Sequence, residues 1–155
     1  LGPFCQKNHL PVCVMHAQGD PDTMHLNPSY SNVVLDVYDA LERQISMLEV
    51  SGMARSAILA DPGIGFGKNV DHNLALLARI SLFHALGTPI LLGVSRKKFI
   101  GTLGNAPQAK DRAAGSIGVA LAGLAQGVQL VRVHDVAETL QAVSLWHAAY
   151  SGSIL

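Results

Sequence analysis

Four short runs of consecutive apolar residues recur along the chain, and each is followed by a segment whose apolar residues return at helical spacing. Continuous apolar runs of this kind are typical of parallel strands that are covered on both faces. They lie at residues 10–15, 57–60, 89–94 and 128–133. Their starts are roughly 30 to 47 residues apart, the range expected for parallel βαβ connections. The pattern therefore predicts four consecutive strand–helix units.

The helices between the runs are predicted from the spacing of apolar residues and from their end signals. The clearest helix carries apolar residues at Val33, Val37, Leu41, Ile45 and Leu48. Gly52 follows it at the position expected of a C-terminal cap. A second helix is predicted from Asp71, as its N-cap, to Leu86, where Gly87 stops it.

The remaining segments complete this outline. Residues 1–9 are typical of the end of a helix, and the polar, proline-containing residues 16–30 predict a loop. After the third run we expect a glycine-containing turn that lasts to Pro107. The Ala- and Gly-rich residues 112–126 and the apolar pattern of residues 137–150 predict two further helices.

Polar residues follow all four runs, and this fixes where a ligand should bind. In a (β/α)8 barrel the carboxyl ends of the strands form the catalytic face, and in an open doubly wound sheet ligands bind at the same edge. We predict an α/β fold of the (β/α)8 TIM-barrel type with only four βα units in this chain, forming one domain over residues 1–155. Strands around Val12 and Leu130 would then be open edges that further structure must cover.

The amino-acid composition and the charge balance limit the kinds of partner that the protein is expected to bind. The 155 residues are 49% hydrophobic and 14% charged, which is typical of a globular domain. Eleven basic and eleven acidic residues balance, so we expect no binding to nucleic acid or to a membrane surface. No apolar run reaches the ~18 residues of a membrane span, and no signal peptide is visible. Cys5 and Cys13 lack zinc-type spacing and favour reduced thiols in a cytoplasmic protein. The first residue is Leu1, so we expect a fragment or a processed chain.

The most informative stretch is Asp61–Lys68, with the sequence DPGIGFGK, directly after the second run. A carboxylate at a strand end, followed by glycines at positions 63, 65 and 67, predicts a loop whose backbone approaches a flat or phosphorylated ligand. The alternative is an ordinary strand-to-helix turn in which Asp61 caps the helix. A glycine-rich loop alone does not decide between the two.

Four motifs, one after each run, together resemble dihydropteroate synthase. They are MHAQG at residues 15–19, DPGIGFGK at 61–68, GVSRKKFIG at 93–101 and RVHD at 132–135. Their order and spacing are similar to strands five to eight of that family's barrel, and the resemblance covers essentially the whole chain. It implies that the amine of para-aminobenzoate displaces pyrophosphate from 6-hydroxymethyl-7,8-dihydropterin diphosphate, which gives dihydropteroate in folate biosynthesis. It also implies a target of sulfonamides.

The resemblance gives three residues an expected catalytic role, beside a carboxylate that holds the pterin. Asp61 would accept two parallel hydrogen bonds from the 2-amino and ring N–H edge of the pterin. Lys97 would donate to the ring oxygen and nitrogen. Arg132 would stack on the pterin and bind phosphate oxygens, and His134 would donate to the leaving group. Arg132 and His134 alternate along an extended segment and so share a face, although a core pair held by carbonyl groups is the alternative.

Four further residues are expected to bind substrate. Ser95 would contact the phosphate or the para-aminobenzoate, and Phe66 would pack against the para-aminobenzoate ring. Met15 would form part of the apolar wall behind the pterin, and Gly63 would belong to the floor of the site. For Met15 and Phe66 the alternative is an ordinary place in the core.

Other polar residues in these motifs are expected to be structural or exposed: Arg96, Lys98, Lys68 and Asp135. His16 has only His134 as a companion, so no metal site built from protein side chains is predicted. The resemblance implies Mg²⁺ on the pyrophosphate, with an Asn ligand from the family's first half, which has no counterpart in these residues.

Two other functions and two assemblies remain open from the sequence. One alternative is a methyltetrahydrofolate-dependent methyltransferase on a similar pterin-binding barrel, and the other is a non-catalytic fragment that binds a pterin or dimerises. The open strand edges predict either a homodimer or completion by a missing N-terminal half.

Overall fold

The fold is built on four parallel strands that lie side by side in chain order. The computed structural model describes residues 2–19 and 27–153. Its strands are β1 (Val12–Met15), β2 (Ile58–Asp61), β3 (Leu91–Leu92) and β4 (Leu130–Val131). β1 pairs with β2 and β3 pairs with β4, and a parallel bridge between Ala60 and Ile90 joins the two pairs. The predicted strand order is present, although β3 and β4 are shorter than their apolar runs.

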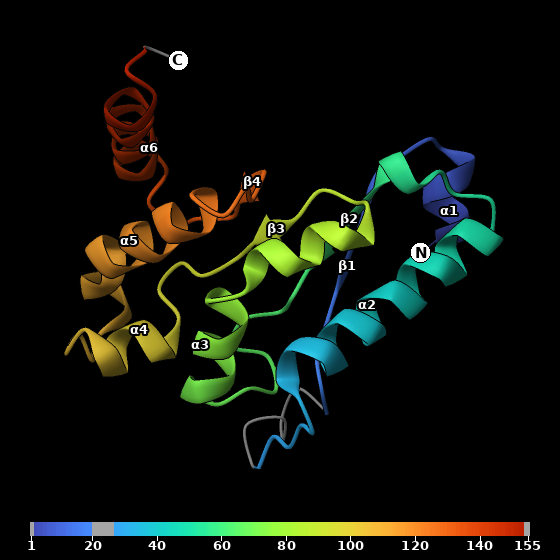
Figure 1. Ribbon diagram of the computed structural model, residues 1–155, viewed down its shortest axis with the longest axis horizontal. Coiled ribbons are helices and arrows are strands. Elements are labelled where there is room, and N and C mark those ends of the chain that lie inside the picture. The colour runs from blue at the N-terminus through green and yellow to red at the C-terminus, as the bar shows by residue number, and fades with distance from the viewer. Residues whose placement is uncertain (1, 20–26, 154–155) are drawn as a thin grey trace.

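A helix follows each strand, and the helices after β1, β2 and β3 lie along one face of the sheet, whereas the helix after β4 projects away from it (Figure 1). The α-helices are α1 (Gly2–Lys7), α2 (Val33–Val50), α3 (Val70–Leu77), α4 (Lys98–Leu103), α5 (Ala113–Leu124) and α6 (Val136–Ser151). Three 3-10 helices are η1 (Arg55–Ala57), η2 (Ile80–Leu86) and η3 (Ala109–Arg112). Within the described chain no helix is both long enough and apolar enough to cross a membrane.

The hydrophobic core fills the space between the sheet and these helices. Alternate strand residues point into it, as the pleat requires, and they include Val12, Val14, Ile58 and Leu92. From the helices, the fully buried side chains include Val37, Leu41, Ile45, Ile80, Phe83 and Leu86. Burying a side chain of this size contributes about 1.5–3 kcal/mol. This packing stabilises the sheet through the face that the helices cover.

The predicted helix from Asp71 to Leu86 is wrong in two respects. It begins after Asn69, whose side chain accepts the backbone N–H of His72 at 2.8 Å while the His72 ring faces the Asn69 N–H in a capping box. It also divides at Arg79 into α3 and η2. Residues 80, 83 and 86 are fully buried at intervals of three, the repeat of a 3-10 helix, so the core favours the tighter winding.

The glycine-containing turn predicted after the third strand is also corrected, because residues 98–103 form α4. Two apolar side chains of this short helix, Phe99 and Ile100, are buried and hold it against the core. Of the predicted loop at 16–30, the described residues 16–19 and 27–30 have no regular structure, and residues 20–26 lie outside the described residues. α2 ends at Val50 with Ser51 as its cap, one residue before the predicted Gly52.

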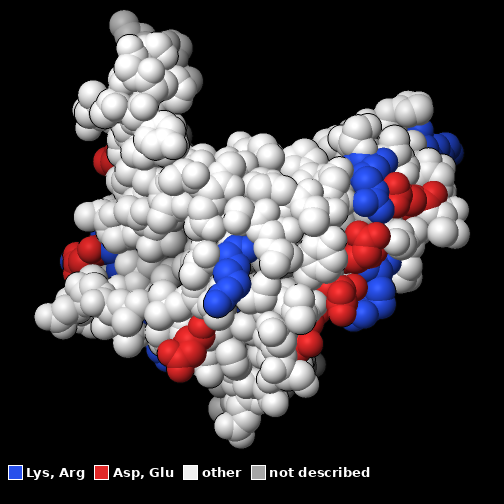
Figure 2. Space-filling model, viewed as in Figure 1, with Lys and Arg blue, Asp and Glu red and all other residues white. Residues whose placement is uncertain are grey.

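The face of the sheet away from the helices is open. Met15 is 38% exposed and Leu130 is 41% exposed, and within residues 2–19 and 27–153 β1 and β4 each have a strand on one side only. α6 extends away from the sheet, and four of its large apolar side chains are exposed: Val136, Leu140, Leu145 and Tyr150. On the face seen in Figure 2, charged side chains are sparse over α6 and gather at the opposite end of the molecule. The open sheet face and α6 therefore leave apolar side chains exposed to solvent.

Candidate functional site

The buried carboxylate of Asp61 lies at the carboxyl end of β2, as predicted. Its Oδ1 accepts the backbone N–H of Gly63 at 2.7 Å. Burial raises the pKa of Asp61, and the Gly63 N–H and the cations Lys97, Lys68 and Arg132 oppose that rise. The alternative in which Asp61 caps the next helix is wrong, because Asn69 caps α3. Asp61 instead shapes its own loop, and it interacts electrostatically with Lys68 of that loop and with Lys97 and Arg132 from the segments after β3 and β4.

The loop of residues 62–68, called here the Asp61 loop, lies directly on the backbone that follows β1. Gly63 and Gly67 have φ angles of 67° and 61°, which side chains rarely adopt. A Cβ on Gly63 would collide with the carbonyl oxygen of His16, and one on Gly67 would collide with the backbone of Gln18. Glycine is therefore required at these two positions, as the motif suggested.

Side chains from two neighbouring segments brace the same loop. Asn73 in α3 accepts the Gly65 N–H at 2.7 Å through its Oδ1. The Tyr30 hydroxyl donates to the Gly67 carbonyl oxygen, also at 2.7 Å. Because buried backbone groups need partners, these contacts stabilise one conformation of the loop.

Lys97 and Phe66, both predicted to bind substrate, are in contact. Lys97 Nζ lies 3.9 Å from the centre of the Phe66 ring, a cation–π arrangement. Burial lowers the pKa of Lys97, and Asp61 opposes this fall. A cavity of about 500 Å³ lies beside this contact, and Gly65, Asn73 and Lys97 are among its lining residues. The pair joins the loops after β2 and β3 into one surface.

Ser95 and His134 are also brought together, from the ends of β3 and β4. Ser95 Oγ lies 3.1 Å from the His134 backbone nitrogen, whose N–H it accepts, and 2.9 Å from His134 Nδ1. When the Ser95 hydroxyl donates to Nδ1, the ring hydrogen of a neutral His134 is on Nε2. Ser95 is buried whereas His134 is exposed. The serine thus orients the imidazole, a contact that the sequence did not predict.

The residues predicted to be scaffold are mostly engaged within the protein. Arg96 forms an ion pair with Asp135, which lowers the pKa of that carboxyl group. Ser116 Oγ accepts the Arg96 N–H at 2.8 Å, and Arg112 donates to the Arg96 carbonyl oxygen at 3.0 Å. Lys98 is exposed. These contacts join the loops after β3 and β4 beside Ser95 and His134.

Met15 and Arg132 complete the set of predicted residues. Met15 is the partner of Asp61 in the β1–β2 register, so it lies next to the carboxylate on the open face of the sheet. Arg132 is exposed at the end of β4 and acts electrostatically on Asp61. The structure therefore places Asp61, Gly63, Phe66 and Met15 at the same edge as Ser95, Lys97, Arg132 and His134.

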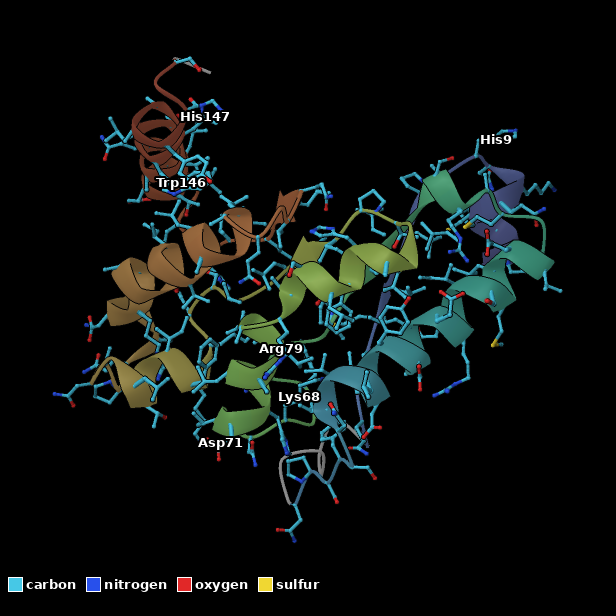
Figure 3. All side chains as sticks on the ribbon, in the orientation of Figure 1. His9, Lys68, Asp71, Arg79, Trp146 and His147 are labelled. Atoms are coloured by element: carbon cyan, nitrogen blue, oxygen red, sulfur yellow. The ribbon has the colours of Figure 1, made fainter. Side chains whose placement is uncertain are left out.

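Three further observations concern an apolar cavity, possible metal ligands and the side chain of Lys68. An apolar cavity of about 600 Å³ lies between α3, α4 and α5, and no predicted site residue lines it. Among residues 2–19 and 27–153 no three His, Cys, Asp or Glu side chains gather as metal ligands. Lys68, which was expected to be structural, is buried, and its Nζ lies 2.9 Å from His16 Nδ1. Figure 3 shows Lys68 beside the N-terminal end of α3.

Comparison with known proteins assigns most of this chain to one family. The family model described as "Pterin binding enzyme" matches residues 2–134. The chain belongs to the pterin-binding enzyme family. Its match to the family runs from α1 to His134 at the end of β4, and so includes every predicted site residue.

The curated relatives of this chain include dihydropteroate synthases and folate synthesis bifunctional proteins. Dihydropteroate synthase of Escherichia coli K12 is 44% identical over 142 residues, which are 92% of this chain and 50% of the relative. Dihydropteroate synthase of Neisseria meningitidis is 44% identical over 140 residues, covering 88% of this chain and 49% of the relative. The sequence resemblance is thus confirmed. The chain spans about half the length of the curated relatives it matches.

Solved structures support the fold in the same way. A Yersinia pestis dihydropteroate synthase with a sulfonamide drug complex superposes with a TM-score of 0.92 at 39% identity, over 98% of this chain and 55% of that one. The Thermus thermophilus enzyme in complex with 4-aminobenzoate gives 0.91 at 38% identity, over 96% and 60%. The predicted (β/α)8 type of fold, with four units here, is confirmed.

Proposed function

We propose that this chain carries the pterin diphosphate site of a dihydropteroate synthase. The observation that carries the proposal is the buried Asp61 carboxylate at the strand ends, facing Lys97 and Arg132. A pterin presents a flat edge of N–H donors, which a carboxylate accepts in pairs. Lys97 would donate to the ring oxygen and nitrogen of the pterin, and Arg132 supplies a cation for the diphosphate.

In the proposed reaction the protein contributes orientation and charge. The amine nitrogen of para-aminobenzoate forms a bond to the methylene carbon of the pterin as the bond from that carbon to the diphosphate oxygen breaks. Pyrophosphate leaves with the bonding electrons, and the amine then loses a proton to solvent. Arg132 and His134 Nε2 would stabilise the departing charge, while Asp61 and Lys97 hold the pterin. An aromatic amine is already nucleophilic, so no general base is needed.

The remaining predicted ligands fit around this arrangement. Phe66 would present its ring to para-aminobenzoate, Met15 would pack behind the pterin, and Gly63 would allow the loop to approach it. Ser95 acts through His134 in addition to any contact with the diphosphate.

Mg²⁺ on the diphosphate remains a prediction from the family resemblance. The described residues offer no group of three side chains for it. Mg²⁺ commonly binds through substrate phosphates with few protein ligands, and when bound it would neutralise part of the leaving charge. A cytoplasmic location is also proposed, and the free thiols of Cys5 and Cys13 are compatible with it.

The test of the proposed site is Asp61→Asn in the complete enzyme. Neutralising a buried carboxylate that forms charge-assisted bonds should cost several kcal/mol and abolish measurable binding of pterin diphosphate by calorimetry. Asp71→Asn is the matched control, because Asp71 is an exposed carboxylate on α3. Unchanged affinity in Asp61→Asn would remove Asp61 from the site, and a protein that binds no pterin would contradict the proposed function.

We also propose that the open sheet is completed by an N-terminal half or by a second copy of this chain. The unpaired edges of β1 and β4 and the exposed side chains on the open face support this proposal. Apolar surface left in water costs roughly 25 cal/mol per Å². Light scattering of the 155-residue chain, with near-UV circular dichroism of Trp146, tests it. A dimer favours pairing of two copies, and a well-packed monomer whose mass is independent of dilution would overturn the proposal.

A further inference from the structure

The buried amino group of Lys68 has no role in the proposed reaction, yet it lies at the centre of the Asp61 loop. Lys68 is 6% exposed. Its Nζ lies 2.9 Å from the Gly63 carbonyl oxygen, 3.0 Å from the Phe66 carbonyl oxygen and 2.9 Å from His16 Nδ1. An ammonium group has three N–H donors, and these three contacts use all of them.

The three acceptors belong to different parts of the site. Gly63 and Phe66 are the two ends of the turn in the loop, which the Phe66 N–H closes by donating to the Gly63 carbonyl oxygen at 3.1 Å. His16 follows β1, and its backbone N–H donates to the Asp61 carbonyl oxygen at 3.0 Å. Lys68 therefore ties both ends of the turn to the neighbouring strand.

The same turn carries the side chains that face the proposed substrates. The Gly63 N–H holds the Asp61 carboxylate at 2.7 Å, and the Phe66 ring lies under Lys97. We propose that Lys68 is a positioning residue, which fixes the Asp61 loop in the shape that aims Asp61 and Phe66 at the substrates. This inference rests on the proposed function, because it assigns those two side chains to substrate binding.

The contact between Lys68 and His16 suits this role in either protonation state. Burial lowers the pKa of Lys68 to about 7, with Asp61 opposing the fall and Lys97 adding to it. Burial, and then Lys68, lower the pKa of His16 to about 4, with Asp36 opposing. His16 is thus neutral near pH 7 and can accept from an ammonium through Nδ1. A neutral Lys68 amine can instead accept a hydrogen from Nδ1, so the link survives.

The main test is Lys68→Met in the complete enzyme. Methionine keeps an unbranched buried stem but donates no hydrogen bond, which leaves two carbonyl groups and one imidazole without their partner. We expect the Kd for pterin diphosphate to rise about tenfold or more.

The matched control is Arg55→Met, at the opposite end of β2. Arg55 donates to the Leu86 carbonyl oxygen at 2.7 Å and forms an ion pair with Glu49 at the same distance, away from the site. We expect this variant to lose stability without a change in the Kd. If Lys68 has only a structural role, Lys68→Met should likewise lose stability without a change in the Kd.

A second pair of variants covers the case in which Lys68→Met does not fold. His16→Leu removes the acceptor on β1, whereas His16→Gln keeps one. Pterin affinity should fall in His16→Leu and recover, in part or fully, in His16→Gln.

The outcomes separate the two proposals. A wild-type protein that binds no pterin overturns the proposed function and this inference with it. Wild-type binding together with unchanged affinity in folded Lys68→Met overturns the positioning role alone. Should Lys68→Met not fold, wild-type affinity in His16→Leu overturns it instead.

Discussion

The two halves of the site differ in how firmly the chain holds them. The Asp61 loop after β2 is buried, and Lys68, Asn73 and Tyr30 all bind its backbone. The segment of residues 132–135 after β4 leaves Arg132 and His134 exposed, and for His134 the partner is Ser95. The half that we propose holds the pterin is therefore preorganised by contacts within this chain, whereas the half that we propose holds the diphosphate is exposed to solvent. Rigidity is useful where a flat ring is recognised, and an open end lets a leaving group depart.

The largest effect that we expect is a selective loss of pterin diphosphate binding when the exposed residues after β4 are changed. Arg132→Ala and His134→Ala should each weaken pterin diphosphate binding about 10- to 100-fold, because a hydrogen bond to a charged group contributes about 1.5–3 kcal/mol. A pterin alcohol without phosphates should lose threefold or less. Calorimetry with both ligands measures the difference. Equal losses of affinity for the two ligands would show that Arg132 and His134 do not bind the diphosphate. The proposed difference between the two halves of the site would then be wrong.

In the buried half of the site, the lowered pKa of Lys68 should make the free energy of unfolding depend on pH. The pKa of Lys68 is about 7 when folded and 10.5 when unfolded, so the unfolded state binds more protons between these values. The free energy of unfolding should therefore rise with pH from about 7 towards 10.5, by up to about 1.4 kcal/mol per pH unit.

Lys68→Met isolates this contribution, because Lys97 remains in both proteins. Urea denaturation at pH 7, 8 and 9 should give a steeper rise for the wild type than for the variant. Parallel curves would mean that Lys68 keeps an ordinary pKa and that the loop is less buried than it is here.

A smaller effect is expected where the two halves meet, at Ser95. Ser95→Ala leaves the His134 ring without its Nδ1 partner, so the ring can turn and change tautomer. We expect pterin diphosphate binding to weaken about fivefold to tenfold, and Ser95→Thr to restore most of it. The combination with His134→Ala is informative. Additive losses in the double variant would show that Ser95 does not act through His134.

Much of the scaffold was predictable because its signals are local. The spacing of Val37, Leu41 and Ile45 predicts α2, and the apolar runs predict the strands. α4 was missed because six residues are too few to show a helical repeat, and Gly101 and Gly104 suggest a turn. α3 and η2 were merged because intervals of three and four cannot be distinguished over so short a segment.

The site was predictable as a list of residues but not as a set of contacts. The motifs locate Asp61, Lys97 and Arg132 because each lies at or shortly after the end of an apolar run. Nothing local links Lys68 to His16 or Ser95 to His134, because sheet pairing brings these residues together across long sequence separations. The parallel order of β1 and β2 was the one available signal, since it brings residue 16 beside the end of β2.

The openness of the sheet has a chemical consequence at Cys13. This thiol is free and exposed on β1, in the register position beside Leu59. Burial and Asp61 raise its pKa, so it should react slowly but measurably with an alkylating reagent. Completion of the sheet would cover it, whereas Cys5 is buried in either case. The rate at which Cys13 is labelled would then report the fraction of molecules whose sheet is uncovered, and no cysteine would have to be introduced.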